Sequence, residues 1–154
     1  MNGMSLIVKT VTRVTVGVIF VFGAYIAAHG HLTLGGGIAG GVIVALAYIL
    51  YVLAYGRTEA EERLSRQRAL AIMTLGALLF LALALAGYRQ GYFMGNFLPT
   101  GEPGKLLSAG VIPFFNLAIM LFLGAGLFVV FLTFIAFRVE VKPEPGEEIE
   151  VGNK

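Results

Sequence analysis

The sequence contains no cysteine and few charged residues: Asp, Glu, Lys and Arg make up 13% of it, against roughly 25% in soluble domains. Without cysteine the chain can form no disulfide, thiolate metal site or thiol nucleophile. Its formal net charge of +2 is too small to indicate nucleic-acid binding. By contrast, 58% of the 154 residues are hydrophobic and the mean hydropathy is +0.87. This composition predicts a membrane protein with little chain left for a soluble catalytic domain.

One long segment, from Val14 to Gly56, has no Asp, Glu, Lys or Arg. It is about twice as long as the roughly 20 helical residues that cross a hydrocarbon core of ~30 Å. Its middle, residues 29–41, reads HGHLTLGGGIAGG. We therefore predict two membrane helices joined by a tight, glycine-rich turn.

The gaps between charged residues predict an all-α integral membrane protein with four transmembrane helices. The predicted spans are residues 7–28, 36–55, 69–88 and 111–137. Lys9 and Arg13 lie near the start of the first span, where long side chains can reach the interface. The charged segment 57–68 has the composition of a solvated connection between helices, and the Gly/Pro-rich segment 91–110 is too interrupted for one regular helix.

The Lys and Arg residues predict the orientation of these spans. If the N-terminus is cytoplasmic, that side holds Lys9, Arg13, Arg57, Arg63, Arg66, Arg68, Arg138, Lys142 and Lys154, and the other side holds only Arg89 and Lys105. This positive-inside bias places both termini in the cytoplasm. We expect a membrane domain at 1–138, followed by an acidic cytoplasmic tail at 139–154 that forms no core of its own.

The second, third and fourth spans contain no Asp, Glu, Lys, Arg or His between their ends. Proton and cation carriers need ionisable groups at depth, because a dehydrated ion must be met by charge or by several oxygens. The chain is therefore not expected to transport ions alone. It could still lend a polar group to a path lined mainly by another subunit.

The glycines are predicted to serve turn formation and close helix packing. Those with these roles are Gly35, Gly36, Gly37, Gly40, Gly41, Gly124 and Gly126. The second span carries two overlapping small-xxx-small pairs, and a glycine at the turn supplies backbone freedom. Residues 35–40 also satisfy G-x-G-x-x-G. That dinucleotide fingerprint requires a preceding strand in a soluble βαβ unit, whereas a hydrophobic helix of membrane length is predicted here.

Three polar residues are candidates for an ion path. His29 and His31 could hydrogen-bond to loop carbonyls at the interface, or relay protons at the outer mouth of a partner's channel, since histidine changes charge near neutral pH. A metal site is not expected, because no carboxylate or thiol lies nearby in sequence. Asn116, inside the fourth span, could hydrogen-bond to a neighbouring helix or coordinate a cation. No catalytic or cofactor-binding residue is predicted.

The run at residues 29–41 is similar to the G-H-x-x-P-G-G-G-F-x-G-G signature of the B subunit (MnhB or MrpB type) of multisubunit sodium/proton antiporters. Leu34 stands in place of the proline and Ile38 in place of the phenylalanine. Asn116 replaces the usual aspartate of a Phe-Asp-x-Gly-Val-like segment, and an amide cannot titrate.

The resemblance implies a small non-catalytic subunit in the plasma membrane of a prokaryotic cell. It would act in a hetero-oligomer with other antiporter-type subunits that exchange Na⁺ and H⁺. The same module also occurs in archaeal membrane-bound hydrogenase and sulfur-reducing complexes, and the sequence does not choose between these settings. An alternative is a small channel or transporter whose pore forms by self-association. The absence of charges inside the spans favours the accessory subunit.

Overall fold

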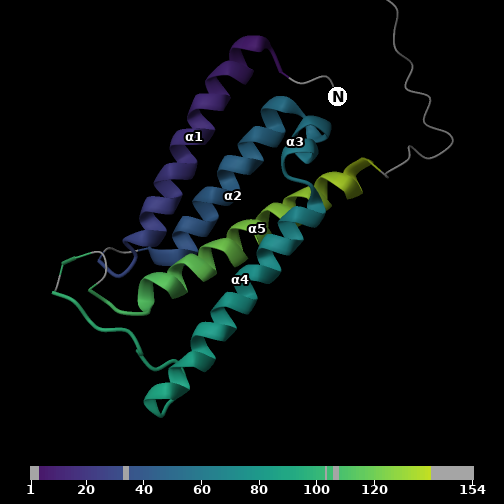
Figure 1. The fold of residues 1–154 in the computed structure, drawn as a ribbon. Coiled ribbons are helices and arrows are strands. Elements are labelled where there is room, and N and C mark those ends of the chain that lie inside the picture. Colours follow the sequence, from purple (N-terminus) through teal and green to yellow (C-terminus); the bar gives the residue numbers. More distant parts are fainter. Residues whose placement is uncertain (1–3, 33–34, 103, 106–107, 140–154) are drawn as a thin grey trace, which may run out of the picture.

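The computed structural model describes residues 4–32, 35–102, 104–105 and 108–139 (Figure 1). All regular secondary structure in these residues is helical. The four long helices are α1 (Leu6–Ala28), α2 (Gly36–Tyr55), α4 (Arg66–Ala86) and α5 (Ile112–Val139). The short α3 (Arg57–Arg63) joins α2 to α4, and the 3-10 helix η1 (Gly87–Gln90) continues α4. The acidic tail predicted at 139–154 lies outside the described residues except for Val139.

Four segments are long and apolar enough to cross a membrane, which confirms the predicted all-α architecture with four spans. They are Leu6–Ala28, Gly36–Tyr55, Arg66–Gln90 and Ile112–Ala136. The third helix begins at Arg66 rather than at residue 69, because Ser65 caps it. The hydroxyl oxygen of Ser65 accepts a hydrogen bond from the backbone N–H of Arg68 at 3.3 Å, which satisfies one donor of the first turn. The orientation of the termini stays a prediction.

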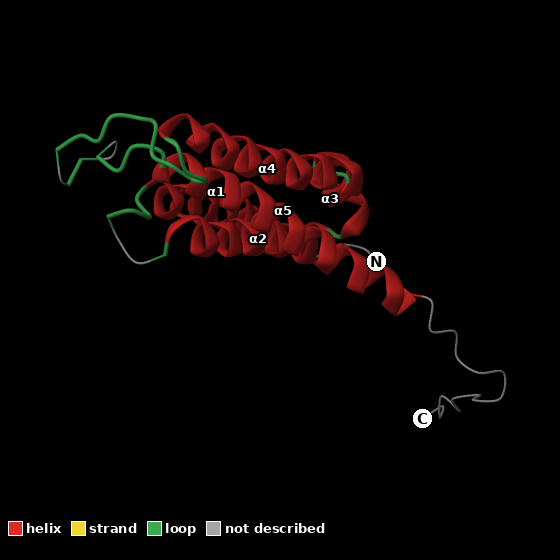
Figure 2. Ribbon diagram, turned by 90° about the horizontal axis from the view of Figure 1, so that it is seen from below, coloured by secondary structure: helices red, strands yellow, loops and turns green. Residues whose placement is uncertain are grey.

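Helix α5 is the central helix of the bundle (Figures 1 and 2). It packs extensively against α2 and against α4, whereas α1 packs mainly against α2 and only lightly against α5. Among the described elements, α4 makes its extensive tertiary contacts with α5 alone. Helix α5 therefore joins α2 to α4, whereas α1 is attached to the bundle mainly through α2.

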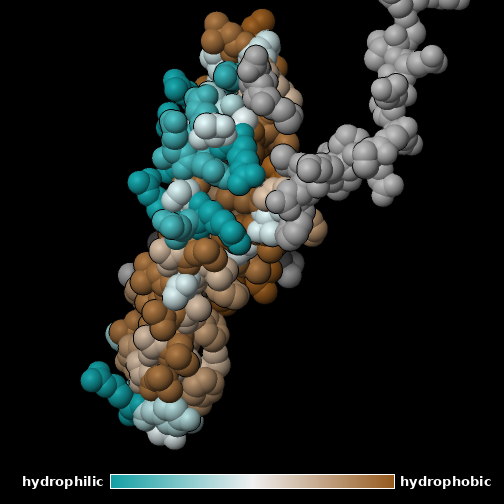
Figure 3. Space-filling view, turned by 90° about the vertical axis from the view of Figure 1, so that its right-hand side faces the viewer, coloured by the Kyte–Doolittle hydropathy of each residue, from teal (hydrophilic) through white to brown (hydrophobic). Residues whose placement is uncertain are grey.

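The start of α1, the end of α2 and α3 meet at one end of the bundle. The hydroxyl of Tyr55 donates a hydrogen bond to the carbonyl of Lys9 at 2.8 Å, and the Lys9 ammonium lies 3.9 Å from the Glu59 carboxylate. Figure 3 shows hydrophilic side chains gathered around α3 toward this end and apolar side chains along most of the remaining length. This distribution fits a helical bundle that projects a charged end from a membrane.

The connection from η1 to α5 contains turns but no regular helix in its described residues. The backbone N–H of Met94 donates to the carbonyl of Ala84 at 3.2 Å, which folds the connection back onto α4. The side-chain oxygen of Asn96 accepts a hydrogen bond from the N–H of Val111 at 3.1 Å. Because this contact lies just before α5, it fixes the position from which α5 begins.

Candidate functional site

The first turn of α2 meets the first turns of α5 at a site that we call the Gly–Asn junction, formed by Gly30, Gly36, Gly37 and Asn116. Gly36 has a φ of +59°, a backbone conformation that residues with a Cβ rarely adopt. A Cβ on Gly30 would lie 2.7 Å from Asn116 Nδ2, and a Cβ on Gly37 would overlap the Asn116 carbonyl oxygen. Only glycine therefore fits these positions without a shift of the backbone.

Asn116 supplies from α5 the cap that α2 lacks in its own sequence. The residue before α2 is Gly35, which has no side chain to accept a hydrogen bond. The Oδ1 atom of Asn116 instead accepts a hydrogen bond from the N–H of Gly37 at 3.3 Å, one of the first-turn donors that a helix leaves unsatisfied. The contact joins residues 79 positions apart, so it links the two helices as well as capping one of them.

The amide nitrogen of Asn116 is buried and has no hydrogen-bond partner among the described residues. A primary amide nitrogen carries two donors, and leaving a buried donor unpaired costs roughly 1–3 kcal/mol. An acceptor such as a water molecule or a carbonyl group of a partner subunit would satisfy this nitrogen. A cation cannot bind at this nitrogen, but Oδ1 retains a second lone pair beside the Gly37 contact.

Replacing Asn116 by alanine is expected to lower the free energy of unfolding by about 1–2 kcal/mol, because the Gly37 N–H loses its acceptor. Asn116→Asp keeps an acceptor and places a negative charge at a helix N-terminus, which is favourable by roughly 0.3–1 kcal/mol. We expect the aspartate variant to retain most of the stability that the alanine variant loses. Thermal unfolding of the purified full chain compares the two, and equal losses in both variants would contradict the capping role.

The two histidines lie in different surroundings. His29 is the C-cap residue of α1; its Nδ1 lies 3.0 Å from the carbonyl of Tyr25, and its ring lies 4.0 Å from the Tyr25 ring. His31 reaches the loop before α5, where its Nε2 lies 3.3 Å from the carbonyl of Lys105. A carbonyl only accepts, so this geometry assigns the donated proton to Nε2.

The second ring nitrogen of His31, Nδ1, is buried and has no partner among the described residues. With Nε2 protonated, a neutral imidazole offers a lone pair at Nδ1, and the cationic ring offers a second N–H there. His31 thus has an unoccupied proton-accepting position close in sequence to the Gly–Asn junction. Within the described residues, no three or more His, Asp or Glu side chains come together in a way that could hold a metal ion.

The other glycines of α2 face α1 and α5. A Cβ on Gly40 would lie 2.7 Å from the Gly23 carbonyl oxygen on α1, and a Cβ on Gly41 would lie 3.2 Å from the backbone nitrogen of Gly124 on α5. Gly126 has more room, because its Cβ would lie 3.4 Å from the sulfur of Met73, an ordinary van der Waals distance.

The sequence analysis did not single out Gly76, which sits at the contact of α4 with α5. A Cβ there would lie 2.6 Å from the backbone nitrogen of Phe122 and 2.9 Å from the carbonyl oxygen of Ala118. Gly76 has no second glycine at the small-xxx-small spacing. The sequence feature that could have identified Gly76 is its isolated position within an apolar helix. A glycine there lowers helix stability, so it usually indicates close packing against a neighbouring element.

Comparison with known proteins shows which family the sequence of this chain matches. Residues 7–136 match a family model described as a domain related to the MnhB subunit of Na+/H+ antiporter. The chain is 35% identical over 125 residues to an uncharacterized protein of Methanocaldococcus jannaschii, over 77% of this chain and 45% of the relative. It is 36% identical over 78 residues to a putative antiporter subunit, mnhB2, of Staphylococcus aureus strain Newman, over 51% of this chain and 55% of the relative. The chain spans about half the length of the curated relatives it matches.

Proposed function

Since the chain belongs to the family of MnhB-related domains, we propose that it is a non-catalytic membrane subunit of a cation/proton antiporter module. It would support Na⁺/H⁺ exchange by packing against the subunits that carry the ion, either in a stand-alone antiporter or within a redox-driven hydrogenase or sulfur-reducing complex. The proposed location is the plasma membrane of a prokaryotic cell, with both termini cytoplasmic as the Lys and Arg distribution predicts.

The observation that carries this proposal, beside the family, is the absence of Asp, Glu, Lys, Arg and His within residues 36–55, 69–88 and 111–137, the interiors of the second, third and fourth spans. Transport of a dehydrated ion needs such groups, so other subunits must supply them. The outer faces of α1 and α4 offer contact surface for those subunits. Only 17% of the residues in the most apolar stretch of each helix are buried within the chain.

The polar groups at the Gly–Asn junction and at His31 favour a second role beside packing. Asn116 Nδ2 and His31 Nδ1 are buried atoms whose hydrogen-bonding capacity is unused among the described residues. A water or a polar group of a neighbouring subunit would complete both of them. We propose that this end of the bundle borders the ion path of a partner, with His31 exchanging a proton there.

The subunit proposal is tested by isolating the full chain from its native membranes through a C-terminal tag in mild detergent. Mass spectrometry should identify larger antiporter-type subunits with buried Lys and Glu residues. Additional iron–sulfur and metal-containing catalytic chains would place the subunit in a redox-driven pump. Recovery of this chain alone would overturn the proposal and favour the alternative, a small channel formed by self-association.

Replacing His31 by glutamine tests the proton-exchange role. A glutamine amide can still donate to the Lys105 carbonyl, but it does not titrate. The Lys105 ammonium is itself 2.7 Å from the Glu102 carboxylate, so that pair is left in place by the substitution. We expect normal assembly with a changed pH dependence of cation-coupled proton transport, because the glutamine amide can neither accept nor release a proton. An unchanged pH profile, measured with the assembled complex in vesicles, would remove His31 from the path.

A further inference from the structure

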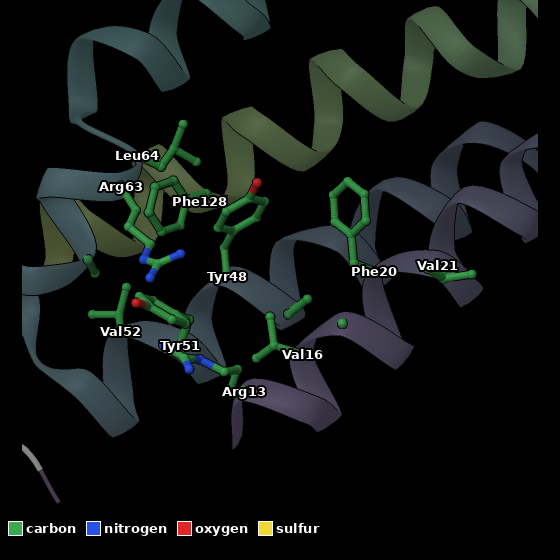
Figure 4. A pocket seen from close by; sticks show the side chains of 13 residues that line it. Arg13, Val16, Phe20, Val21, Tyr48, Tyr51, Val52, Arg63, Leu64 and Phe128 are labelled. Atoms are coloured by element: carbon green, nitrogen blue, oxygen red, sulfur yellow. The ribbon is translucent and has the colours of Figure 1, made fainter. Parts of the chain in front are cut away.

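A cavity of about 450 Å³ opens beside α1, near the end of the bundle where α3 lies (Figure 4). Its apolar wall includes Val16 and Phe20 from α1, Tyr48 from α2 and Phe128 from α5. Val21 also lines it and is 68% exposed, so the cavity opens along the outer face of α1. In a membrane, any part of that face that no other subunit covers meets lipid acyl chains, and a cavity of this size lies in the range of small-ligand sites.

Two arginines border this cavity, Arg13 from α1 and Arg63 from α3. In Figure 4 both side chains extend toward Tyr51, and the Arg63 guanidinium lies 5.6 Å from the centre of the Tyr51 ring. The ring contact occupies a face of the guanidinium and leaves its N–H groups available for an acceptor. Two planar guanidinium groups, each with several N–H donors, are thus present at one edge of an apolar cavity.

Neither arginine has a carboxylate within ion-pair distance in the described part of the chain. Other cations at the same end do have one: Lys9 lies 3.9 Å from Glu59, and Arg57 lies 2.6 Å from Glu61. Arg13 is the eighth residue of α1, so at 1.5 Å per residue its Cα lies about 10 Å along the helix from Leu6. Arg13 is therefore attached inside the span, next to the apolar residues of the cavity, rather than at the first residues of the helix.

We propose that this cavity binds an anionic phospholipid. The phosphate group would accept hydrogen bonds from Arg13 and Arg63, since guanidinium forks match phosphate oxygens. An acyl chain would lie along Val16, Phe20 and Phe128. A small soluble anion would satisfy the arginines but leave the apolar wall in water, whereas a phospholipid matches both parts, and basic pockets between membrane helices are known lipid sites. The inference goes beyond the proposed antiporter role and does not depend on it.

The charge requirement is tested on the full chain purified in detergent, with phosphatidylglycerol and phosphatidylcholine as the two probes. Native mass spectrometry should show preferential retention of phosphatidylglycerol. The double variant Arg13→Gln with Arg63→Gln should lose that preference by roughly tenfold or more, because two charge-assisted contacts are removed. The matched control is Arg66→Gln, an exposed arginine of the same end that does not line the cavity. Equal retention of the two lipids by the unaltered chain, or undiminished preference in the double variant, would overturn the proposal.

The cavity itself is tested with Gly17→Leu. Gly17 lines the cavity, and a Cβ on it would meet nothing within 4 Å, so a larger side chain begins in open space and requires no shift of the backbone at its Cβ. We expect retention of phosphatidylglycerol to fall several-fold without any loss of thermal stability in the lipid-free chain, since leucine is also favoured over glycine within a helix. Loss of a partner subunit from the isolated complex, with lipid retention unchanged, would assign the cavity to a protein contact and contradict lipid binding.

Discussion

Replacing Gly37 by alanine should destabilise the chain by roughly 3 kcal/mol or more and prevent its assembly with partner subunits. The new Cβ would overlap the backbone carbonyl oxygen of Asn116, and no side-chain rotation can relieve a contact with backbone. The helices would have to separate, which would also break the Gly37 N–H to Asn116 hydrogen bond. Leucine at the same position should have a still larger effect.

The control for this prediction is Gly126→Ala, the same substitution inside α5. Its Cβ would lie 3.4 Å from the flexible side chain of Met73, so no backbone shift is required. Alanine is favoured over glycine within a helix by about 1 kcal/mol, and this gain applies at both positions. We therefore expect opposite signs: Gly126→Ala neutral or stabilising, Gly37→Ala strongly destabilising. Thermal unfolding and co-purification of partners give both readouts, and similar behaviour of the two variants would contradict close packing at the Gly–Asn junction.

The number of membrane-spanning helices and their approximate limits could be predicted from the sequence, because charged residues interrupt apolar runs of membrane length. The short α3 was not predicted, since segment 57–68 was interpreted as a solvated connection. The resemblance to the MnhB family was likewise visible in the glycine-rich run at 29–41, and the family match confirms it. Both features consist of residues that are close together in the sequence, so they can be recognised without knowing how the chain folds.

The pairing of helices could not be predicted in the same way. Helices α2, α4 and α5 are apolar on all sides, so the periodicity that marks the buried face of a soluble helix is absent. Asn116 was recognised as a polar residue in the fourth span, but its partner Gly37 lies 79 residues away. The cavity beside Arg13 and Arg63 combines residues of four helices. In the sequence analysis both arginines contributed to the predicted topology, and Arg13 also counted as a side chain that can reach the interface, but nothing placed the two together.

Gly76 provides the sharpest test of how the bundle is connected. Because α4 makes its extensive contacts with α5 alone, a Cβ placed 2.6 Å from the Phe122 backbone nitrogen should release α4 from the rest of the bundle. We expect Gly76→Ala to lower the free energy of unfolding by about 2–3 kcal/mol, since overpacking against backbone outweighs the gain in helix propensity. The contacts of α1, α2 and α5 should persist, because none of them passes through α4.

The absence of cysteine makes this separation measurable helix by helix. The Phe80 and Phe115 rings lie 5.1 Å apart across the α4–α5 contact, and those of Tyr48 and Phe128 lie 5.6 Å apart across the α2–α5 contact. Cysteines introduced at either pair can be joined by a short bifunctional maleimide. In the Gly76→Ala background, cross-linking at the first pair should fall several-fold while the second pair still reacts. An equal loss at both pairs would instead show that α4 supports the whole bundle, and an unchanged first pair would show that the α4–α5 contact adapts to a larger residue.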